Sequence, residues 1–371
     1  MILVAIIFGC YFLGLLVIGY GWYLSTRTAQ PTTVSPQPLT VLIAIRNEAQ
    51  NLPLLIADLK QQEHPPHRVI LVDDHSTDGS AALAEQLTQM DPRFLVTRLA
   101  QGQGKKQAIA HGVSLATTEW VCMTDADGRL PVTWLASMQS ALHAQHALLI
   151  GPVFLSKPQS FFQRLQNMEW ASLQAITFGT AGLGRPVMCN GANLAFAKAA
   201  FLRVGGYSGN DHIPSGDDEF LLRKIQQEDG RGISFCNDAR ATVFTAYQQS
   251  LSSFWQQRIR WASKWRHNPS ALAKVMAVAV LVFQVTYLIA AVQALMGGKH
   301  APILLACVGV KWAMEAMLLG AVTVHHRQRW SLMAFLTWQV VYPFYVLAVG
   351  VSSWFIRYEW KGRPQPQPQH R

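Results

Sequence analysis

Two aspartates stand one residue apart in Asp125-Ala126-Asp127, directly after the apolar run WVCMT. Carboxylates this close repel each other unless a cation lies beside them. Mg²⁺ commonly binds one or two carboxylates together with the phosphates of a substrate. The same residues are good turn formers, so an ordinary polar turn is the alternative. The pair Asp125 and Asp127 therefore predicts either a divalent metal site or a turn.

Other acidic residues also follow apolar runs or begin a helix. Glu48 comes after TVLIAI, and the pair Asp73-Asp74 comes after RVILV. The triplet Asp217, Asp218 and Glu219 precedes an amphipathic helical pattern. Helix dipoles favour carboxylates in the first turn, but three in a row exceed what a cap requires. One of the three could act as a general base on a hydroxyl group.

Basic and amide side chains form three further groups. Lys105 and Lys106 follow GQG at the start of a helical stretch, where they could bind phosphate or form a solvated basic cap. The run CNGANLAF, which contains Asn193, could be the polar wall of a sugar site or a turn. The stretch 251–267 is rich in Trp and Arg, which is typical of a helix in the headgroup layer of a membrane. A second such helix is expected at 159–178.

The segments that position these residues alternate between apolar runs and helical patterns. The apolar runs at 40–45, 68–72, 94–99 and 120–124 are separated by helical stretches, which indicates an α/β domain with a mainly parallel sheet. Ligands of such sheets bind outside the carboxyl ends of the strands. Three of these strand ends carry acidic residues, so the sequence predicts one site at this edge.

Four long apolar runs predict an integral membrane protein. Residues 1–24 contain no charge and read as an uncleaved anchor, and the runs at 275–297, 301–324 and 331–356 are long enough to cross a bilayer. Lys311 and Glu315 are four residues apart, so they can pair on one helical face. Pro343 interrupts the last run, which membrane helices tolerate.

The topology of these runs contains a conflict. If the polar region between the first two runs faces the cytosol, the basic residues at 325–329 also lie inside, as the positive-inside rule prefers. Three crossings after that region would place Arg357, Lys361 and Arg363 outside. Either the tail is an exception, or one apolar run is interfacial or re-entrant.

The content of charged residues indicates which kinds of partner the protein binds. Only 14% of the 371 residues are charged, against roughly 25% in soluble domains. The net charge of +10 comes from 31 basic and 21 acidic residues, and the basic residues crowd the ends of the apolar runs. We expect contact with a lipid bilayer and no binding of nucleic acid, because no basic tract alternates with aromatic residues. The five cysteines have no CxxC spacing, which supports neither disulfides nor a zinc site.

The order of the motifs is more specific than any single one. The succession IRNEA, VDDHSTDG, GKKQA, DAD, CNGAN, GDDE and QRIRW resembles the membrane-bound, inverting members of glycosyltransferase family 2 over about residues 38–268. The likeness is greatest to ceramide glucosyltransferase-like and bacterial glycolipid-forming enzymes. It implies a GT-A fold, a Rossmann-like α/β domain joined to transmembrane helices.

The resemblance also implies roles for individual residues. Asp127 is the expected direct ligand of Mg²⁺ or Mn²⁺, with Asp125 beside it, and Asp218 or its neighbour Asp217 is the expected base on the acceptor hydroxyl. The residues expected to hold the nucleotide-sugar are Glu48, Asp73, Asp74, Lys105, Lys106 and Asp125. Those expected to contact the diphosphate or the acceptor are Asn193, Gln257, Arg260 and Trp261, with Arg260 also stabilising the leaving group. Two departures are His75, where the family most often has Gly, and Glu219, which leaves the identity of the base open by one residue.

The implied activity is transfer of a sugar from a UDP-sugar to a hydroxyl of a membrane lipid or lipid-linked acceptor, with inversion. The alternatives are a processive polysaccharide synthase and, from another class, an inactive membrane scaffold or a transporter. We expect a bacterial inner-membrane protein whose catalytic domain faces the cytosol. The expected division is an anchor at 1–24, a linker at 25–38, a GT-A domain at 39–250, an interfacial helix at 251–270, three spans at 271–356 and a polar tail at 357–371.

Overall fold

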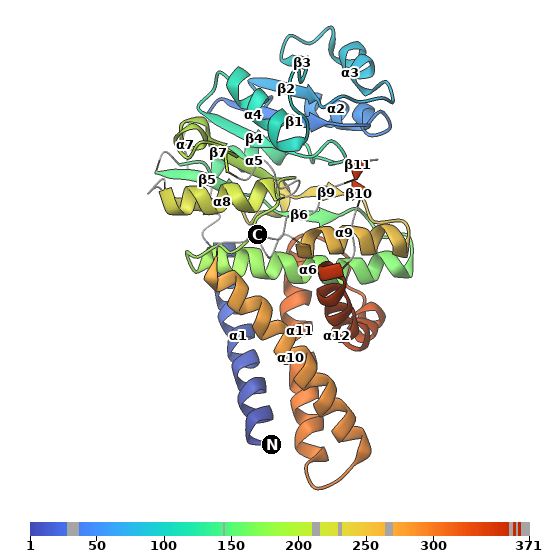
Figure 1. Cartoon of the computed structure of the whole chain (residues 1–371). Helices are drawn as coiled ribbons and strands as arrows, with labels where there is room; N and C mark the ends of the chain where they lie inside the picture. The colour runs from blue at the N-terminus through green and yellow to red at the C-terminus, as the bar shows by residue number, and fades with distance from the viewer. Residues whose placement is uncertain are drawn as a thin grey trace.

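The computed structural model describes residues 1–27, 37–143, 145–209, 216–228, 232–263, 270–355, 359–360 and 363–364. Most of the expected linker and tail, the end of the expected interfacial helix, and the basic residues Arg357 and Lys361 lie outside these ranges. In Figure 1 a sheet domain lies at one end of the molecule, and long helices extend from it toward the other end.

The sheet domain is built on seven strands in the order β3-β2-β1-β4-β7-β5-β8. The strands β1 to β4 are parallel, β7 runs antiparallel to both of its neighbours, and β5 pairs in parallel with β8. The predicted mainly parallel sheet is therefore confirmed, with one reversed strand. The strands of this sheet are β1 (Leu39–Ile45), β2 (Arg68–Asp73), β3 (Phe94–Arg98), β4 (Trp120–Met123), β5 (His146–Ile150), β7 (Leu194–Ala197) and β8 (Gly232–Phe235).

Helices cover this sheet because its central strands are apolar on both faces. Every residue of β4 and β7 is buried, and so is all of β1 except Ala44. Helix α4 packs on β1 and β2, and α3 packs on β3. The covering helices are α2 (Leu52–Lys60), α3 (Ser80–Thr88), α4 (Lys105–Leu115), α5 (Trp134–Ser140), α7 (Lys198–Arg203) and α8 (Asp217–Glu228), with the short 3-10 turn η1 (Ala239–Ala241).

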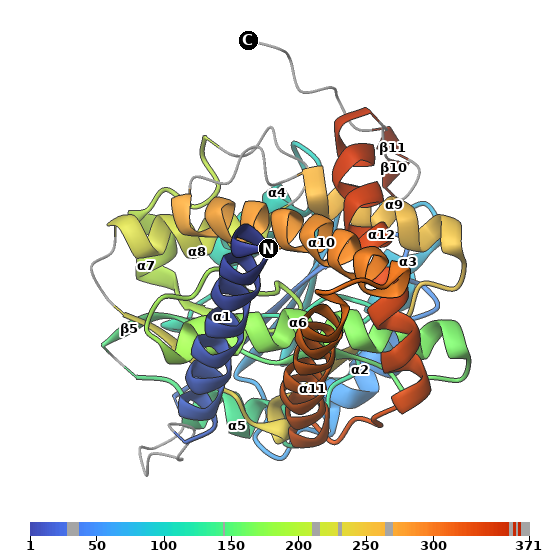
Figure 2. The same ribbon diagram turned by 90° about the horizontal axis from the view of Figure 1, so that it is seen from below.

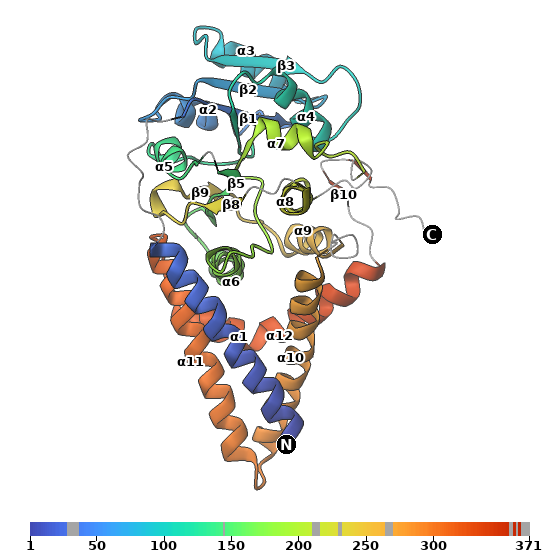
Figure 3. The ribbon, with the colours of Figure 1, turned by 90° about the vertical axis from the view of Figure 1, so that its left-hand side faces the viewer.

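A smaller layer lies between the sheet and the long apolar helices. It contains the parallel pair β6 (Val153–Leu155) and β9 (Val243–Thr245), together with α6 (Phe161–Gly182) and α9 (Leu251–Ser263). Figure 3 shows α6 and α9 lying side by side beneath the sheet domain. The expected position of α6 in the lipid headgroup layer stays a prediction. Residues such as Trp170 and Phe178 are buried against the protein, whereas Phe161 at the start of the helix is exposed. Helix α6 is the platform on which the sheet domain and the long apolar helices meet.

The four predicted apolar helices are present. They are α1 (Ile2–Arg27), α10 (Ala271–Met296), α11 (Ala301–His325) and α12 (Leu332–Phe355), and each is long and apolar enough to cross a membrane. The ammonium group of Lys311 lies 2.9 Å from the Glu315 carboxylate, so the expected pair forms. Pro343 lies inside α12. The remaining pair, β10 (Glu359–Trp360) and β11 (Arg363–Pro364), is antiparallel.

Glycines let α1 and α6 approach each other closely. A Cβ atom on Gly21 of α1 would clash with the backbone of Gly179, and one on Gly182 would clash with the backbone of Gly21. Figure 2 shows α1 crossing the end of α6 at this place. The contact joins the first long apolar helix, α1, directly to the platform helix α6 beneath the sheet.

We predict that Gly21→Ala destabilises the protein, because the added methyl group forces two backbones apart. Overpacking of this kind costs about 1–3 kcal/mol, so the midpoint of thermal unfolding in detergent should fall by several degrees. Gly14→Ala is the matched control in the same helix, because a Cβ at Gly14 meets nothing within 4 Å. Equal unfolding temperatures for the two variants would show that the close contact is not needed.

Candidate active site

A cavity of about 640 Å³ opens at the carboxyl edge of the sheet and extends down to α12, one of the long apolar helices. Its upper wall comes from the ends of β1 and β4 and from the first turns of α4 and α8. Its lower wall comes from α6, α9 and α12. The cavity thus joins the acidic strand ends to an apolar helix, and most residues predicted from the motifs line it.

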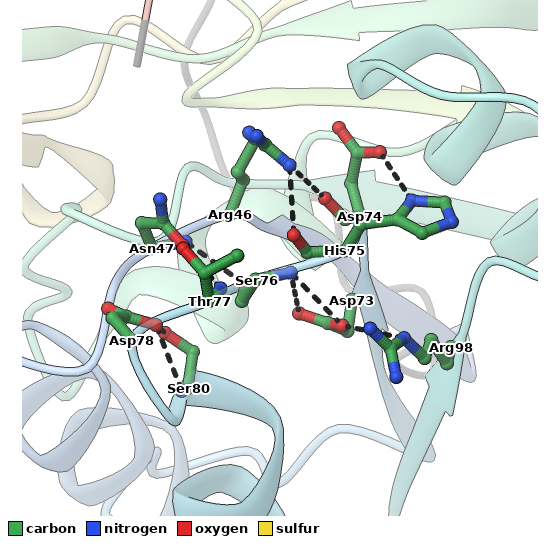
Figure 4. A network of polar contacts seen from close by, with 10 residues as sticks. All are labelled: Arg46, Asn47, Asp73, Asp74, His75, Ser76, Thr77, Asp78, Ser80 and Arg98. Carbon is green, nitrogen blue, oxygen red and sulfur yellow. Dashed lines mark hydrogen bonds and ion pairs between the residues drawn. The ribbon is translucent and has the colours of Figure 1, made fainter. Parts of the chain in front are cut away.

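Hydrogen bonds join the motifs IRNEA and VDDHSTDG to each other beside this cavity (Figure 4). Arg46 Nη1 donates to the carbonyl oxygens of Asp74 at 2.7 Å and His75 at 3.0 Å. The backbone N–H of Glu48 donates to Ser80 Oγ at 2.8 Å. His75 has a φ of 57°, a left-handed conformation that favours glycine, which gives the physical reason for Gly at this place in the family. These hydrogen bonds hold Glu48 and Asp74 on the cavity wall.

The two carboxylates of the Asp73-Asp74 pair differ in position. Asp74 lines the cavity and accepts a hydrogen bond from the backbone N–H of Gly104 at 3.0 Å. Asp73 is not among the cavity-lining residues. It accepts from the backbone N–H of Ser76 at 3.2 Å and lies 3.6 Å from Arg98 Nε (Figure 4). Asp74 is therefore placed for direct contact with a ligand, whereas Asp73 holds the turn that presents it.

Lys105 joins three of the motifs. Its ammonium group lies 2.7 Å from the Asp125 carboxylate and 3.0 Å from the Asp217 carboxylate. Burial favours the neutral amine, but these two negative charges outweigh that effect and hold the pKa of Lys105 well above its usual value. Lys105 is therefore a fixed positive charge between the end of β4 and the start of α8.

Lys106 points elsewhere. Its ammonium group lies 4.8 Å from the centre of the Phe220 ring and 5.9 Å from that of Tyr207, and the residue is buried and absent from the cavity wall. Both sequence interpretations, phosphate binding and a solvated cap, disagree with this position. Lys106 instead makes a cation–π contact that packs α4 against α8.

Asp125 and Asp127 both reach the cavity. Asp127 Oδ2 accepts a hydrogen bond from Thr245 Oγ1 of β9 at 3.1 Å. Within the described ranges, no three His, Cys, Asp or Glu side chains gather closely enough to hold a metal ion by themselves. The donor set therefore fits a cation that takes one or two carboxylates from the chain and further oxygen ligands from a bound phosphate.

The acidic start of α8 faces the same cavity. Asp217, Asp218 and Glu219 all line it. The Asp218 carboxylate accepts from the backbone N–H of Gly191 at 3.1 Å and from that of Glu219 at 2.8 Å. The first bond ties α8 to Gly191 of the CNGAN motif, and together the two bonds fix the Asp218 carboxylate in the cavity wall.

Asn193 lies behind the cavity rather than on its wall. The side chain is fully buried, donates to the carbonyl oxygens of Pro152 and Ala241 at 2.8 Å each, and accepts from Trp134 Nε1 at 2.9 Å. Its position does not fit the expected contact with an acceptor. Asn193 instead joins β7 to the segments on either side of it.

Helix α9 brings the last motif to the lower wall. Gln257, Arg260 and Trp261 line the cavity, as the motif predicted for side chains near a ligand. The Trp261 ring packs against the Trp170 ring of α6, with centroids 5.6 Å apart. The interpretation of α9 as a helix in the headgroup layer stays a prediction; Arg258 on its protein-facing side is buried, and Leu251 at its start is exposed.

Sequence reasoning missed a buried polar cluster of Glu169, Arg258 and Tyr345. Arg258 Nε donates to Glu169 Oε2 at 2.9 Å, and the Tyr345 hydroxyl of α12 donates to Glu169 Oε1. The Arg258 guanidinium also stacks on Phe254 and Trp261, at 4.1 and 4.5 Å from the ring centres. The sequence feature that could have indicated this cluster is Glu169 itself, because it is the only acidic residue in the stretch 159–178.

Comparisons with known proteins agree with this geometry. Residues 40–203 match the family model of "Glycosyl transferase family 2". The poly-beta-1,6-N-acetyl-D-glucosamine synthase of Staphylococcus aureus (strain COL) is 24% identical over 229 residues, which are 60% of this chain and 53% of the synthase. The enzyme of the same name from Staphylococcus epidermidis is 21% identical over 228 residues, again 60% and 53% of the two chains. The chain thus spans about half the length of the curated relatives it matches.

A solved structure extends the likeness to the fold. The mannosyltransferase PcManGT from Pyrobaculum calidifontis, in complex with GDP-Man and Mn²⁺, has a TM-score of 0.55 and 19% sequence identity. The similarity covers 95% of this chain and 98% of the mannosyltransferase. The sheet domain therefore has the GT-A fold that the sequence motifs implied.

We predict that Glu169→Ala strongly destabilises the protein, because Arg258 is then left buried without its carboxylate partner. Breaking a buried ion pair from one side costs about 3–5 kcal/mol. Arg93→Ala is the control, because its pair with Asp91 is partly exposed and such surface pairs contribute about 0–1 kcal/mol. The unfolding midpoint in detergent should fall sharply for the first variant and little for the second. Similar small shifts in both would contradict the importance of the cluster.

Proposed function

We propose that the chain is a glycosyltransferase, which transfers a sugar from a nucleotide-sugar donor to a hydroxyl of a membrane lipid or lipid-linked acceptor, with inversion at the anomeric carbon. The support from the comparisons is the match of residues 40–203 to the family 2 model. The observation that carries this proposal is that one cavity is lined both by the acidic strand ends and by α12, one of the apolar helices. A site of this kind can receive a polar donor from one side and a lipid from the other.

The donor is proposed to bind at the upper wall. Glu48 and Asp74 provide carboxylates for the hydroxyl and N–H groups of a ribose and a base, with UDP as the preferred nucleotide. Asp73 supports Asp74 through the 73–76 turn. Lys105 supplies a fixed positive charge near the diphosphate, held by Asp125 and Asp217.

The carboxylates Asp127 and Asp125 would hold Mg²⁺ or Mn²⁺ together with the donor diphosphate. The support is the donor set itself, two cavity-lining carboxylates next to the expected phosphate position. When bound, such an ion neutralises charge that develops on the leaving diphosphate. Gln257 and Arg260 of α9 line the same cavity and are proposed to contact that diphosphate from below.

The reaction is a single displacement. The acceptor oxygen forms a bond to the anomeric carbon while the bond from that carbon to the diphosphate oxygen breaks, and the bonding electrons leave with the nucleoside diphosphate. Asp218 takes the proton of the acceptor hydroxyl, since its carboxylate lines the cavity and is held by two backbone N–H groups. Attack from the face opposite the leaving group converts an α-linked donor into a β-linked product.

The acceptor is proposed to enter from the membrane side. Tyr345 and Val349 of α12 and Trp261 of α9 form the lower part of the wall, which is where the glycosyl-accepting end of a lipid would lie. An inner-membrane location, with the sheet domain on the cytosolic side, fits the supply of nucleotide-sugars.

A processive polysaccharide synthase is the second candidate. It is favoured by the relatives, which are named as synthases of poly-beta-1,6-N-acetyl-D-glucosamine. The match covers only 53% of the relative, so the name of the relative does not decide whether this chain adds one sugar or many.

The test is release of nucleoside diphosphate by the purified protein in detergent, with UDP-glucose, UDP-N-acetylglucosamine and GDP-mannose as donors and Mn²⁺ or Mg²⁺ present. We expect release that depends on added membrane lipid extract, and a lipid product whose mass rises by one sugar. A ladder of many sugars would favour the synthase. No release with any donor, in protein whose thermal unfolding is normal, would overturn the proposal.

Variants of α8 in the same assay identify the base. Asp218→Asn should lower the rate by about 10²–10⁴-fold, the usual contribution of general base catalysis. Glu219→Gln is the neighbouring control and should keep most of the activity. The reverse order of effects would move the base to Glu219.

A further inference from the structure

The upper wall of the cavity carries more negative than positive charge. In the part of the chain that the structure describes, seven acidic residues line it: one after β1, one after β2, two after β4 and three at the start of α8. The basic residues that line it from the end of β1 and from α4 are Arg46 and Lys105. A nucleoside diphosphate is itself an anion, so this wall repels it unless positive charge arrives with it.

The ammonium group of Lys105 is held on three sides of this wall. Its Nζ lies 2.7 Å from Asp125 Oδ1 and 3.0 Å from Asp217 Oδ2. A Cβ atom on Gly191 would lie 3.3 Å from Nζ, so the backbone of this glycine is close on the third side. The Lys105 side chain is 24% exposed and lines the cavity, and a ligand in the cavity can therefore reach it.

This contact changes what Asp125 offers to a divalent cation. A cation that is bound by Asp125 and Asp127 must share the Asp125 carboxylate with the ammonium group of Lys105. The two positive charges then repel each other, because both are close to the same carboxylate. Mg²⁺ in such sites takes one or two carboxylates from the protein and completes its ligands with phosphate oxygens of a substrate. The Lys105 contact therefore makes the phosphate oxygens the more important part of the donor set.

A diphosphate reverses the effect of Lys105. Its oxygens are anionic acceptors, so they can bind the ammonium group as well as the cation. The side chain that repels a free divalent cation thus attracts the same cation when it arrives with a diphosphate. The acidic wall acts in the same direction, because it disfavours a nucleotide that carries no cation.

We propose that Lys105 makes binding of the divalent cation depend on the donor, so that the ligand of this site is the complex of the nucleotide-sugar with the cation. The inference rests on the proposed function, because it takes the diphosphate of a nucleotide-sugar as the ligand. The dependence is reciprocal: the factor by which the nucleotide strengthens binding of the cation is also the factor by which the cation strengthens binding of the nucleotide.

The test measures Mn²⁺ binding directly and does not depend on enzymatic activity. Mn²⁺ is titrated into the full-length protein in detergent, with and without UDP, and free Mn²⁺ is measured by electron paramagnetic resonance. A titration without protein corrects for Mn²⁺ that UDP binds in solution. In the unaltered protein we expect UDP to strengthen Mn²⁺ binding by about 5–150-fold, the usual range for coupled sites.

Lys105→Met removes the ammonium group from the wall and keeps a long unbranched side chain. We expect this variant to bind Mn²⁺ without UDP about tenfold more tightly than the unaltered protein, and to gain less from UDP, because the repulsion at Asp125 is gone. Lys106→Met is the matched control. It removes the same charge from the next residue of α4, whose ammonium group faces the Phe220 ring, and it should bind Mn²⁺ like the unaltered protein.

Three results would overturn the inference. The first is Mn²⁺ binding by Lys105→Met that is no tighter without UDP than in the unaltered protein. The second is an equal gain in Lys105→Met and Lys106→Met. The third is Mn²⁺ binding by the unaltered protein that UDP does not change, which requires no variant to fold. Donor turnover that persists beside any of these results leaves the proposed function standing, whereas a protein that binds no UDP at any Mn²⁺ concentration refutes both.

Discussion

The contact of Lys105 with Asp125 and Asp217 is the interaction on which the candidate site depends. The parallel half of the sheet directs several carboxylates to one edge, and these repel one another in the absence of a cation. Lys105 lies between two of them, at 2.7 and 3.0 Å, and so links the end of β4 to the start of α8. Because α8 carries Asp218, the same contact places the proposed base relative to the proposed donor site.

The platform helix α6 is the second constraint. It contacts α1 through glycines, and it contacts both α9 and α12 through Glu169. Residues of α6 also form part of the cavity wall. The long apolar helices and the sheet domain are therefore not independent units joined by a flexible link. A change in the position of α12 would act on Arg258 and Trp261 through the Glu169 carboxylate.

The elements of the fold could be predicted because their signals are local. Uninterrupted apolar runs such as RVILV form buried strands, and the chain geometry then brings Glu48, Asp74 and Asp125 to one edge. The directions of neighbouring side chains could not be predicted in the same way. Of Lys105 and Lys106, about 100° apart on one helix, only the first faces the cavity.

Asn193 and Glu169 show why the rest of the site needed the structure. Asn193 belongs to a motif that borders the cavity, but its side chain points back into the core and is used by three hydrogen bonds. Glu169 belongs to no motif, and its importance comes from a partner 89 residues away, Arg258. Hydropathy also identified α12 as a long apolar helix without giving its direction relative to α11.

The most direct test of the central claim, that the acids at this edge bind a nucleotide-sugar with a divalent cation, is calorimetric binding of UDP to the purified protein with and without Mn²⁺. The account predicts binding that is strengthened by Mn²⁺, and a loss of that strengthening in Asp127→Asn, while Arg93→Ala behaves as the unaltered protein. Absence of UDP binding, or equal affinity with and without Mn²⁺ in both the unaltered protein and Asp127→Asn, would contradict it.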